Sequence, residues 1–195
     1  MGQTWGPAVK KYSKEITSIR DTGKASEFSY RTPFQNLIDH YARAKGLSLK
    51  TIQEQKRERF GAPDFAVLAH DSIPHGYIET KDIDVNLSDI LTGRLRADKE
   101  RLDKYLEAVP NLVLTNYEDF CLFRDGKKIA TASLSQPQRL EELLETFFLY
   151  EYPPATRPKE LAVHLAKRCK VLKEVVLETL KLEEGAKAEK VLSPY

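Results

Sequence analysis

The sequence predicts an α/β fold in which helices flank a mixed central β-sheet. Two patterns predict it: apolar residues recur at helical spacing in several segments, and short β-rich runs lie between those segments in two groups of three. The expected order of elements is α-α-β-β-β-α-β-β-β-α-α. Hydrophobic residues make up 41% and charged residues 31% of the 195 residues, which is enough for one domain with a core of its own.

The amino-terminal part predicts two helices. Residues 8–20 favour a short helix, which Gly23 and the small polar residues around it end. Thr32 followed by Pro33 is typical of a helix start, with threonine as the N-cap and proline at the first helical position. Apolar residues then recur at helical spacing, so we expect an amphipathic helix from Pro33 to about Lys45.

The first group of strands follows that helix. Residues 49–60 (LKTIQEQKRERF) predict a strand of mixed polarity. Residues 64–70 and 76–81 are short and β-rich, and the segment DSIPH separates them. We therefore expect these two runs to form a hairpin or a closely related pair.

A helix over residues 97–109 precedes the second group of strands. The run NLVLTN (111–116) has the length and apolar character of a strand. Residues 117–133 predict a hairpin that turns at Asp125-Gly126, the strongest short turn signal in the chain.

The carboxy-terminal part predicts two further helices. Ser135 and Gln138 form a capping-box pattern, and apolar residues recur at helical spacing up to Phe148. The proline-rich segment 152–158 then interrupts the pattern before a long last helix. We expect one domain over 1–152 and a helical extension over 153–195.

Composition excludes several classes of protein. The formal net charge is +2, so the chain lacks the overall basic field of a histone-like binder, although 31 Lys and Arg allow a local basic patch. Cys121 and Cys169 have no metal-ligand spacing and suggest reduced thiols in a cytoplasmic protein. No stretch approaches the roughly eighteen apolar residues of a membrane span.

Three ionisable residues interrupt the apolar hairpin: Asp64, Glu79 and Lys81. Side chains alternate along a strand, so Glu79 and Lys81 project from the same face while Thr80 points the other way. If residues 71–75 form the turn, Asp64 lies opposite the 80–82 region. The two carboxylates and the ammonium can then meet at one point.

Two carboxylates so close repel each other unless a cation lies between them. A hard divalent ion fits that need, and Mg²⁺ is the expected one, with Asp64, Glu79 and the Thr80 carbonyl as ligands. Lys81 could orient an attacking water or offset charge on a phosphate. Together these groups provide what phosphodiester hydrolysis requires. The alternative is structural, because proline-aspartate often opens a strand and Glu-x-Lys is a common weak ion pair.

Pro63-Asp64 and Glu79-Thr80-Lys81 resemble the signature of the PD-(D/E)xK nuclease superfamily. The segments ASEFSYRTPFQNLIDHY, GAPDF, GYIETKDI and LDKYLEAVPNLVLTNYEDFCLF resemble the amino-terminal Mrr-like nuclease domain of single-chain restriction–modification enzymes of the type ISP and type IIG-like groups. The resemblance covers about residues 25–150. It implies a restriction-endonuclease-like fold for this part of the chain.

The resemblance also implies a function. It implies a cytoplasmic, Mg²⁺-dependent DNA endonuclease of phage defence, with Mn²⁺ able to substitute and double-stranded DNA as substrate. Water would attack a backbone phosphate and leave a 5′-phosphate and a 3′-hydroxyl. Methyltransferase and target-recognition domains would belong to the same longer polypeptide. Asp64 and Glu79 would bind the metal and Lys81 would be the catalytic lysine.

Members of this superfamily often carry a further acid near an early helix, and Glu27 is the candidate here, with a structural capping role as the alternative. Mrr-like members often carry a glutamine four residues before a tyrosine in the helix after the Glu-x-Lys strand. Here the tyrosine is Tyr105 and the matching position is Arg101. An arginine at that position could still bind a phosphate.

Basic residues near the motif are candidates for phosphate contacts, with a solvated surface as the alternative. They are Lys56, Arg57 and Arg59 before the motif and Arg94 and Arg96 after it. The four histidines show no ligand spacing, which argues against zinc. Two other functions remain open: a DNA-docking scaffold that retains a nuclease-like fold, and a glycosidase that uses Asp64 and Glu79 as acid and base.

Overall fold

The computed structural model describes residues 5–53, 63–68 and 74–151, together with Ala166 and Cys169. The chain divides into two compact units, Met1–Glu151 and Tyr152–Tyr195, and the elements below belong to the first. In chain order they are α1 (Trp5–Asp21), the 3₁₀ helix η1 (Glu27–Tyr30), α2 (Arg31–Ala44), β1 (Lys50–Gln53), β2 (Phe65–Leu68), β3 (Pro74–Thr80), α3 (Leu87–Leu91), α4 (Arg96–Ala108), β4 (Asn111–Thr115), β5 (Asp119–Arg124), β6 (Lys127–Ser133) and α5 (Pro137–Phe148).

The six strands form one sheet in the order β1-β2-β3-β4-β5-β6. Four of the neighbouring pairs are antiparallel, and β3 and β4 are parallel, with Glu79 opposite Leu114. The sheet is therefore mixed, as the sequence predicts. A parallel pair needs a crossover connection, and α3 and α4 form it.

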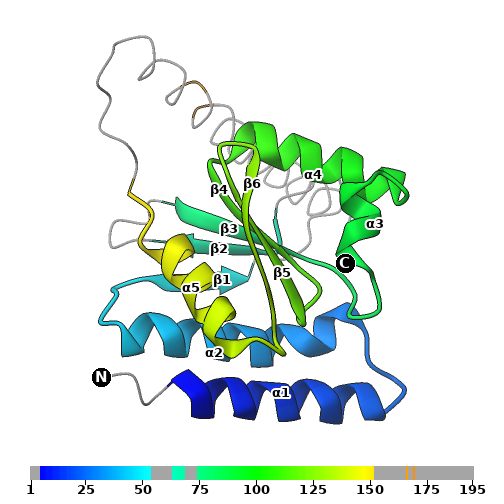
Figure 1. Ribbon diagram of the computed structural model, residues 1–195, viewed down its shortest axis with the longest axis vertical. Helices are drawn as coiled ribbons and strands as arrows, with labels where there is room; N and C mark the ends of the chain where they lie inside the picture. Colours follow the sequence, from blue (N-terminus) through cyan, green and yellow to red (C-terminus); the bar gives the residue numbers. More distant parts are fainter. Residues whose placement is uncertain (1–4, 54–62, 69–73, 152–165, 167–168, 170–195) are drawn as a thin grey trace, which may run out of the picture. The chain divides into compact units, whose positions relative to one another are not determined.

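The helices cover the sheet from both sides. Figure 1 shows α1, α2 and α5 on one side and α3 and α4 on the other. Alternation along the strands assigns residues to these two sides: Ile78 and Val113 belong to the core cluster with α1, α2 and α5, while Tyr77 and Leu114 are buried on the opposite face. The fold is thus a three-layer α/β arrangement.

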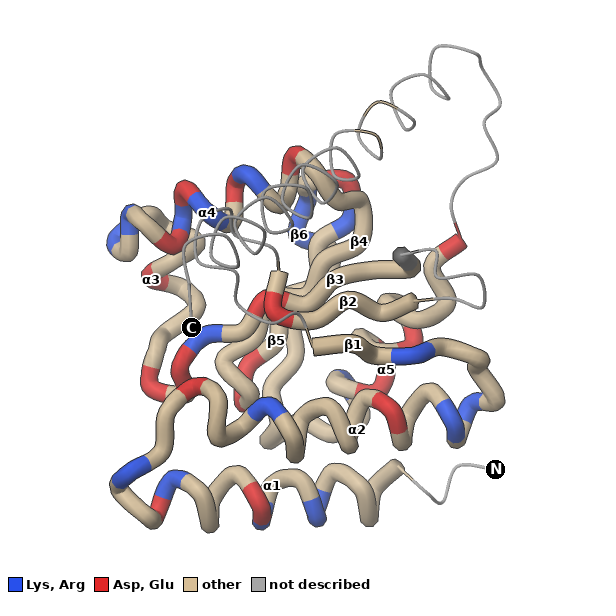
Figure 2. The backbone as a smooth tube through the Cα atoms, turned by 180° about the vertical axis from the view of Figure 1, so that it is seen from behind, with Lys and Arg blue, Asp and Glu red and all other residues tan. Residues whose placement is uncertain are grey.

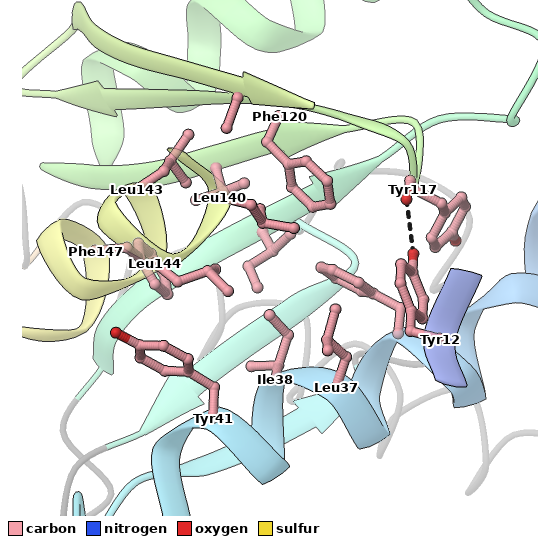
Figure 3. Packing of buried hydrophobic residues seen from close by; sticks show 14 of the residues in the cluster. Tyr12, Leu37, Ile38, Tyr41, Tyr117, Phe120, Leu140, Leu143, Leu144 and Phe147 are labelled. Carbon is pink, nitrogen blue, oxygen red and sulfur yellow. Dashed lines mark hydrogen bonds between the residues drawn. The ribbon is translucent and has the colours of Figure 1, made fainter. Parts of the chain in front are cut away.

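The main core is rich in aromatic side chains (Figure 3). Phe34 of α2 makes edge-on contacts with Phe65 of β2 and with Tyr117, at centroid distances of 5.6 and 5.7 Å. The Tyr12 hydroxyl of α1 donates a hydrogen bond of 2.8 Å to the backbone oxygen of Tyr117. These contacts join the two amino-terminal helices to the end of the sheet where β3 and β4 finish.

Several sequence predictions are confirmed. The two strand groups, the helix between them and the helix after them all form, and the second hairpin turns at Asp125 and Gly126, whose φ angles are 48° and 78°. Two positive φ values in sequence are what a type I′ turn requires. Among the described helices, none combines the length and the apolar character that a bilayer span needs.

Both predicted helix caps are wrong. The 3₁₀ helix η1 continues directly into α2, so Thr32 lies inside the first turn of α2. Ser26 is the N-cap of η1, and the Ser26 N–H donates to Ser29 Oγ at 3.1 Å. Helix α5 begins at Pro137 after Gln136 as N-cap, and Ser135 Oγ instead contacts Ser133 Oγ at 3.1 Å. A proline at the first position starts α5 without a capping box.

Other element boundaries also differ. Helix α1 begins at Trp5, three residues earlier than expected, and β3 begins at Pro74. Helix α3 was not expected, although Asn86 caps it by accepting a hydrogen bond of 2.9 Å from the N–H of Ser88. The second half of the predicted strand 49–60 and most of the last predicted helix lie outside the described residues.

Candidate active site

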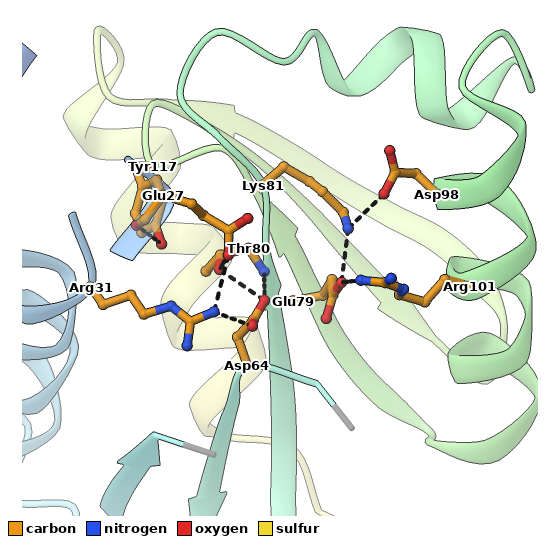
Figure 4. Close-up of polar contacts among 9 residues, drawn as sticks. All are labelled: Glu27, Arg31, Asp64, Glu79, Thr80, Lys81, Asp98, Arg101 and Tyr117. Atoms are coloured by element: carbon orange, nitrogen blue, oxygen red, sulfur yellow. Dashed lines mark hydrogen bonds and ion pairs between the residues drawn. The ribbon is translucent and has the colours of Figure 1, made fainter. Parts of the chain in front are cut away.

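Buried charge in the described part of the chain is confined to one place. The four charged residues buried there are Arg31, Asp64, Glu79 and Lys81, each at most 7% exposed. They lie where β2 begins and β3 ends, together with partly exposed Glu27, Asp98 and Arg101 (Figure 4). Charged groups avoid protein interiors unless they are paired, so this cluster is the first candidate for a functional site.

The pairing of β2 with β3 brings Asp64 to the cluster. Phe65 lies opposite Ile78, which places Asp64 beside Glu79 and Thr80, whereas the sequence predicted the 80–82 region. The pairing also shifts between Val67 and Leu68: Val67 lies opposite Gly76, and Leu68 lies opposite Pro74. The register therefore differs from the one that a simple turn over 71–75 predicts. The Thr80 N–H and the Thr80 hydroxyl both donate to Asp64 Oδ2, each at 2.8 Å.

Arg31 and Glu27 form one side of the cluster. Arg31 Nη2 forms ion pairs with Asp64 Oδ1 and with Glu27 Oε1, the latter at 3.0 Å. Glu27 Oε1 also accepts a hydrogen bond of 3.2 Å from the Thr80 hydroxyl, and the Tyr117 hydroxyl donates to the Glu27 backbone oxygen at 2.9 Å. Although Glu27 lies far from the hairpin in sequence, η1 thus holds it next to Asp64.

Lys81 and helix α4 form the other side. Lys81 Nζ forms ion pairs with Glu79 Oε1 at 2.9 Å and with Asp98 Oδ1 at 2.8 Å. Arg101 Nη1 lies 3.8 Å from the same oxygen of Glu79. Figure 4 shows the Asp64 carboxylate between Arg31 on one side and Glu79 on the other. The sequence predicts that Lys81 and both acids share one point. In the structure the two acids are neighbours and each has its own cation: Lys81 contacts Glu79, and Arg31 contacts Asp64.

Burial and mutual repulsion shape the electrostatics of the two acids. Burial, and to a lesser extent the charge of Asp64, raise the pKa of Glu79 from 4.5 to about 7 against the opposing effects of Lys81 and Arg101. Burial lowers the pKa of Lys81, but Glu79 and Asp98 outweigh this effect, so the pKa of Lys81 is raised and its amine is charged at neutral pH. The site thus contains a carboxyl group whose anion is disfavoured by burial.

The residues present fit a divalent cation held by two carboxylates. Asp64 and Glu79 offer hard oxygen donors at the adjoining ends of β2 and β3. Burial, and then the charge of Asp64, raise the pKa of Glu79, and a bound cation would oppose both effects. Within the described ranges, no three His, Cys, Asp or Glu side chains form a metal-binding group, so Glu27 does not complete a carboxylate triad. Arg31 and Lys81 hold the two acids through ion pairs instead.

The predicted basic residues lie in different settings. Arg94 and Arg96 project from the α3–α4 region with side chains 79% and 88% exposed, and each pairs with a neighbouring acid, Asp89 or Glu100. Arg101 is half-exposed and points at Glu79. Figure 2 shows basic and acidic positions mixed along α4. Lys56, Arg57 and Arg59 lie outside the described residues.

The sequence analysis missed two residues of the cluster. Arg31 follows Glu27 by four residues, a spacing that places the two side chains together on a helical segment, so this pair carried a readable signal. Asp98 carried none, because its place beside Lys81 depends on how α4 packs against the sheet.

Comparisons with known proteins bear on the fold. No family model and no curated protein matches the chain. The structure is similar to a chain in the cryo-EM structure of a DrdV–DNA complex, with a TM-score of 0.58 and 24% sequence identity over 75% of this chain. The match spans 14% of that much longer chain. This likeness shows a shared fold.

Proposed function

We propose that this chain is a Mg²⁺-dependent DNA endonuclease domain of a restriction–modification enzyme, of the PD-(D/E)xK type. The observation that carries the proposal is that, among the described residues, buried charge is confined to the place where Asp64, Glu79 and Lys81 lie. Ionisable groups with perturbed pKa values in one cluster are typical of active sites. The scaffold alternative offers no reason to retain a buried Glu79 whose pKa burial raises to about 7.

The side chains have separate roles in this proposal. Asp64 and Glu79 hold the cation, with the Thr80 carbonyl as a further expected ligand. When bound, a divalent ion supplies a lowered pKa for an attacking water and positive charge beside the scissile phosphate. Lys81, which is charged, stabilises the negative charge that develops on the phosphate. Glu27 fixes Arg31 and Thr80 and thereby the orientation of Asp64.

DNA is the proposed substrate because of the fold and the surface. The similar chain was solved in a complex with DNA. Arg94, Arg96 and Arg101 lie on the α3–α4 connection that also carries Asp98. Lys56, Arg57 and Arg59, which precede the motif in the sequence, are further candidates. Such residues contact the phosphate backbone and position it without reading sequence. Sequence specificity and methylation belong, in this proposal, to other domains of a longer polypeptide.

A plasmid-nicking assay tests the proposal. The purified chain is incubated with supercoiled plasmid in Mg²⁺, in Mn²⁺ and in EDTA, and open-circular product is measured. We expect product with either metal and none with EDTA. Lys81→Ala is expected to lower the rate about a hundredfold or more, because it removes a charge aimed at the transition state. Lys45→Ala, which removes a lysine paired with Glu141 at the exposed end of α2, is the matched control and should keep full activity.

Calorimetry with Mg²⁺ separates an enzyme from a scaffold. The wild-type chain should bind Mg²⁺, and Asp64→Ala should lose that binding. The proposal is wrong if Mg²⁺ binding does not depend on Asp64. It is also wrong if nicking is unchanged both by EDTA and by Lys81→Ala.

A further inference from the structure

Asp98 holds the Lys81 ammonium from the side opposite Glu79. The Lys81 Nζ–Asp98 Oδ1 distance is 2.8 Å, as short as the 2.9 Å contact with Glu79 Oε1. Lys81 is 7% exposed, whereas the Asp98 side chain is 32% exposed. The ammonium therefore lies at the boundary between the sheet and solvent, with one carboxylate on each side.

The carboxylates of Glu79 and Asp98 differ in their other partners. Glu79 Oε1 also lies 3.8 Å from Arg101, and in the proposed function Glu79 binds the cation. Asp98 lies in the first turn of α4, and within the described contacts its partner is Lys81. A lysine side chain has several rotatable bonds and loses rotamer entropy when it is fixed. Asp98 is the partner that can keep Lys81 fixed while Glu79 is engaged elsewhere.

We propose that Asp98 is a positioning residue that acts through Lys81, an inference that rests on the proposed endonuclease function. It holds the ammonium in position to face the phosphate, through a contact that does not involve Glu79. Asp98 itself need not touch DNA or metal. The crossover between the parallel strands thereby contributes to catalysis as well as to the sheet, because α4 carries Asp98 to the end of β3.

A structural role for Asp98 alone is the competing explanation. Helix α4 is anchored by Leu102 and Tyr105, which are 2% and 7% exposed. An acid in the first turn also stabilises a helix slightly through the helix dipole. A structural role predicts a small loss of stability and no selective effect on turnover.

The experiment compares Asp98→Asn, Asp98→Ala and Asp98→Glu with the wild-type chain in single-turnover plasmid nicking. We expect Asp98→Asn to slow nicking about tenfold and Asp98→Ala up to about a hundredfold, because hydrogen bonds to charged groups are worth that much in rate. Asp98→Glu should recover part of the rate. The DNA concentration at half-maximal rate and the Mg²⁺ affinity from calorimetry should both stay within about twofold of wild type, because Asp98 itself contacts neither DNA nor the metal in this proposal. Asp103→Asn, which loses an outward ion pair with Lys99 on the same helix, is the matched control and should nick normally.

A double variant separates action through Lys81 from any other action. If Asp98 acts through Lys81, then Lys81→Ala/Asp98→Asn is no slower than Lys81→Ala alone. Multiplied losses in the double variant, weakened Mg²⁺ binding, or wild-type nicking by Asp98→Asn would overturn the role of Asp98 alone. A wild-type chain that binds Mg²⁺ but never nicks DNA overturns the endonuclease proposal, and the role of Asp98 with it.

Discussion

The Arg31 guanidinium forms an ion pair with the Asp64 carboxylate that is almost closed to solvent, with side chains 5% and 9% exposed. Arg31 Nη2 also reaches Glu27 at 3.0 Å, so one cation serves two acids. Both oxygens of Asp64 therefore have protein partners: Arg31 at Oδ1 and Thr80 at Oδ2. A divalent ion that binds Asp64 has to compete with Arg31.

Arg31→Gln is expected to destabilise the chain and to increase its response to Mg²⁺. Removing one partner of a buried ion pair typically costs about 3–5 kcal/mol, because the other charge stays buried and unpaired. The same change removes the competitor for Asp64, so added Mg²⁺ should raise the melting temperature more in Arg31→Gln than in wild type. Thermal unfolding with Mg²⁺ and with EDTA measures both effects. Arg20→Gln breaks the half-exposed pair with Glu118 and should cost no more than about 1 kcal/mol. Equal responses to Mg²⁺ in wild type and Arg31→Gln would contradict the competition.

Glu79→Gln is expected to stabilise the metal-free chain at high pH. The pKa of Glu79 is raised from 4.5 to about 7, first by burial. Between these values the folded chain keeps a proton that the unfolded chain has lost, so the stability from this group is present at low pH and lost as pH rises through the window. A neutral glutamine removes that loss, which is on the order of 3 kcal/mol well above pH 7.

Urea unfolding in EDTA at pH 5 and pH 8 tests the Glu79 prediction. The gain of Glu79→Gln over wild type should be larger at pH 8, and the variant should not nick DNA. Asp64→Asn is the matched comparison and should be less stable than wild type at both pH values, because it leaves Arg31 buried beside a neutral amide. A gap between Glu79→Gln and wild type that does not change with pH would show that Glu79 titrates normally.

Gly76→Ala is expected to destabilise the fold strongly. A Cβ atom at Gly76 would lie 2.6 Å from Phe147 Cε2 and 2.7 Å from Asn111 Nδ2. Asn111 Nδ2 donates to the Phe147 backbone oxygen at 3.0 Å, so neither neighbour can move without losing contacts. Overpacking of this kind typically costs about 1–3 kcal/mol. Chemical unfolding measures it, with Gly6→Ala in α1 as the control, where a Cβ meets nothing within 4 Å. An equal stability of the two variants would contradict the predicted clash.

His75 is expected to make the chain less stable in mild acid. Burial lowers the pKa of His75 from 6.5, and its ring Nε2 contacts the Phe147 backbone oxygen at 3.1 Å. Just below pH 6.5 the unfolded chain therefore binds a proton that the folded chain does not, and stability falls as pH decreases through that window. His75→Gln, which can still donate to Phe147, should flatten this part of the stability curve. Unfolding free energies from pH 5 to pH 7.5 for both chains check the difference, and identical slopes would disprove it.

Local signals in the sequence predict most of the fold. The Asp125-Gly126 turn, the apolar run at 111–115 and the spacing of α2 and α5 each follow from short-range chemistry, and all of them form. Helix caps were harder, because η1 and Pro137 supply starts that Thr32 and Ser135 were expected to supply. Tertiary context decided these boundaries.

The site was predictable in composition but only partly in geometry. The spacing of Asp64, Glu79 and Lys81 identified the strands and the acids, because strand pairing is a local rule. The partners of those residues come from α2 and α4, which are distant in sequence. Sequence periodicity does not predict the contact between Arg31 and Asp64 or the contact between Asp98 and Lys81, because both depend on how helices pack on the sheet.

The parallel alignment of β3 and β4 has a consequence for how such a domain can diversify. The chain that leaves β3 must travel back before β4 can begin, so residues 81–110 form a bridge fastened to the rigid sheet at both ends. The bridge carries Lys81 and Asp98, whereas Glu79 lies on β3 and Asp64 directly precedes β2. Substitutions in this bridge can therefore change the residues that surround the carboxylates without changing the strands of the sheet.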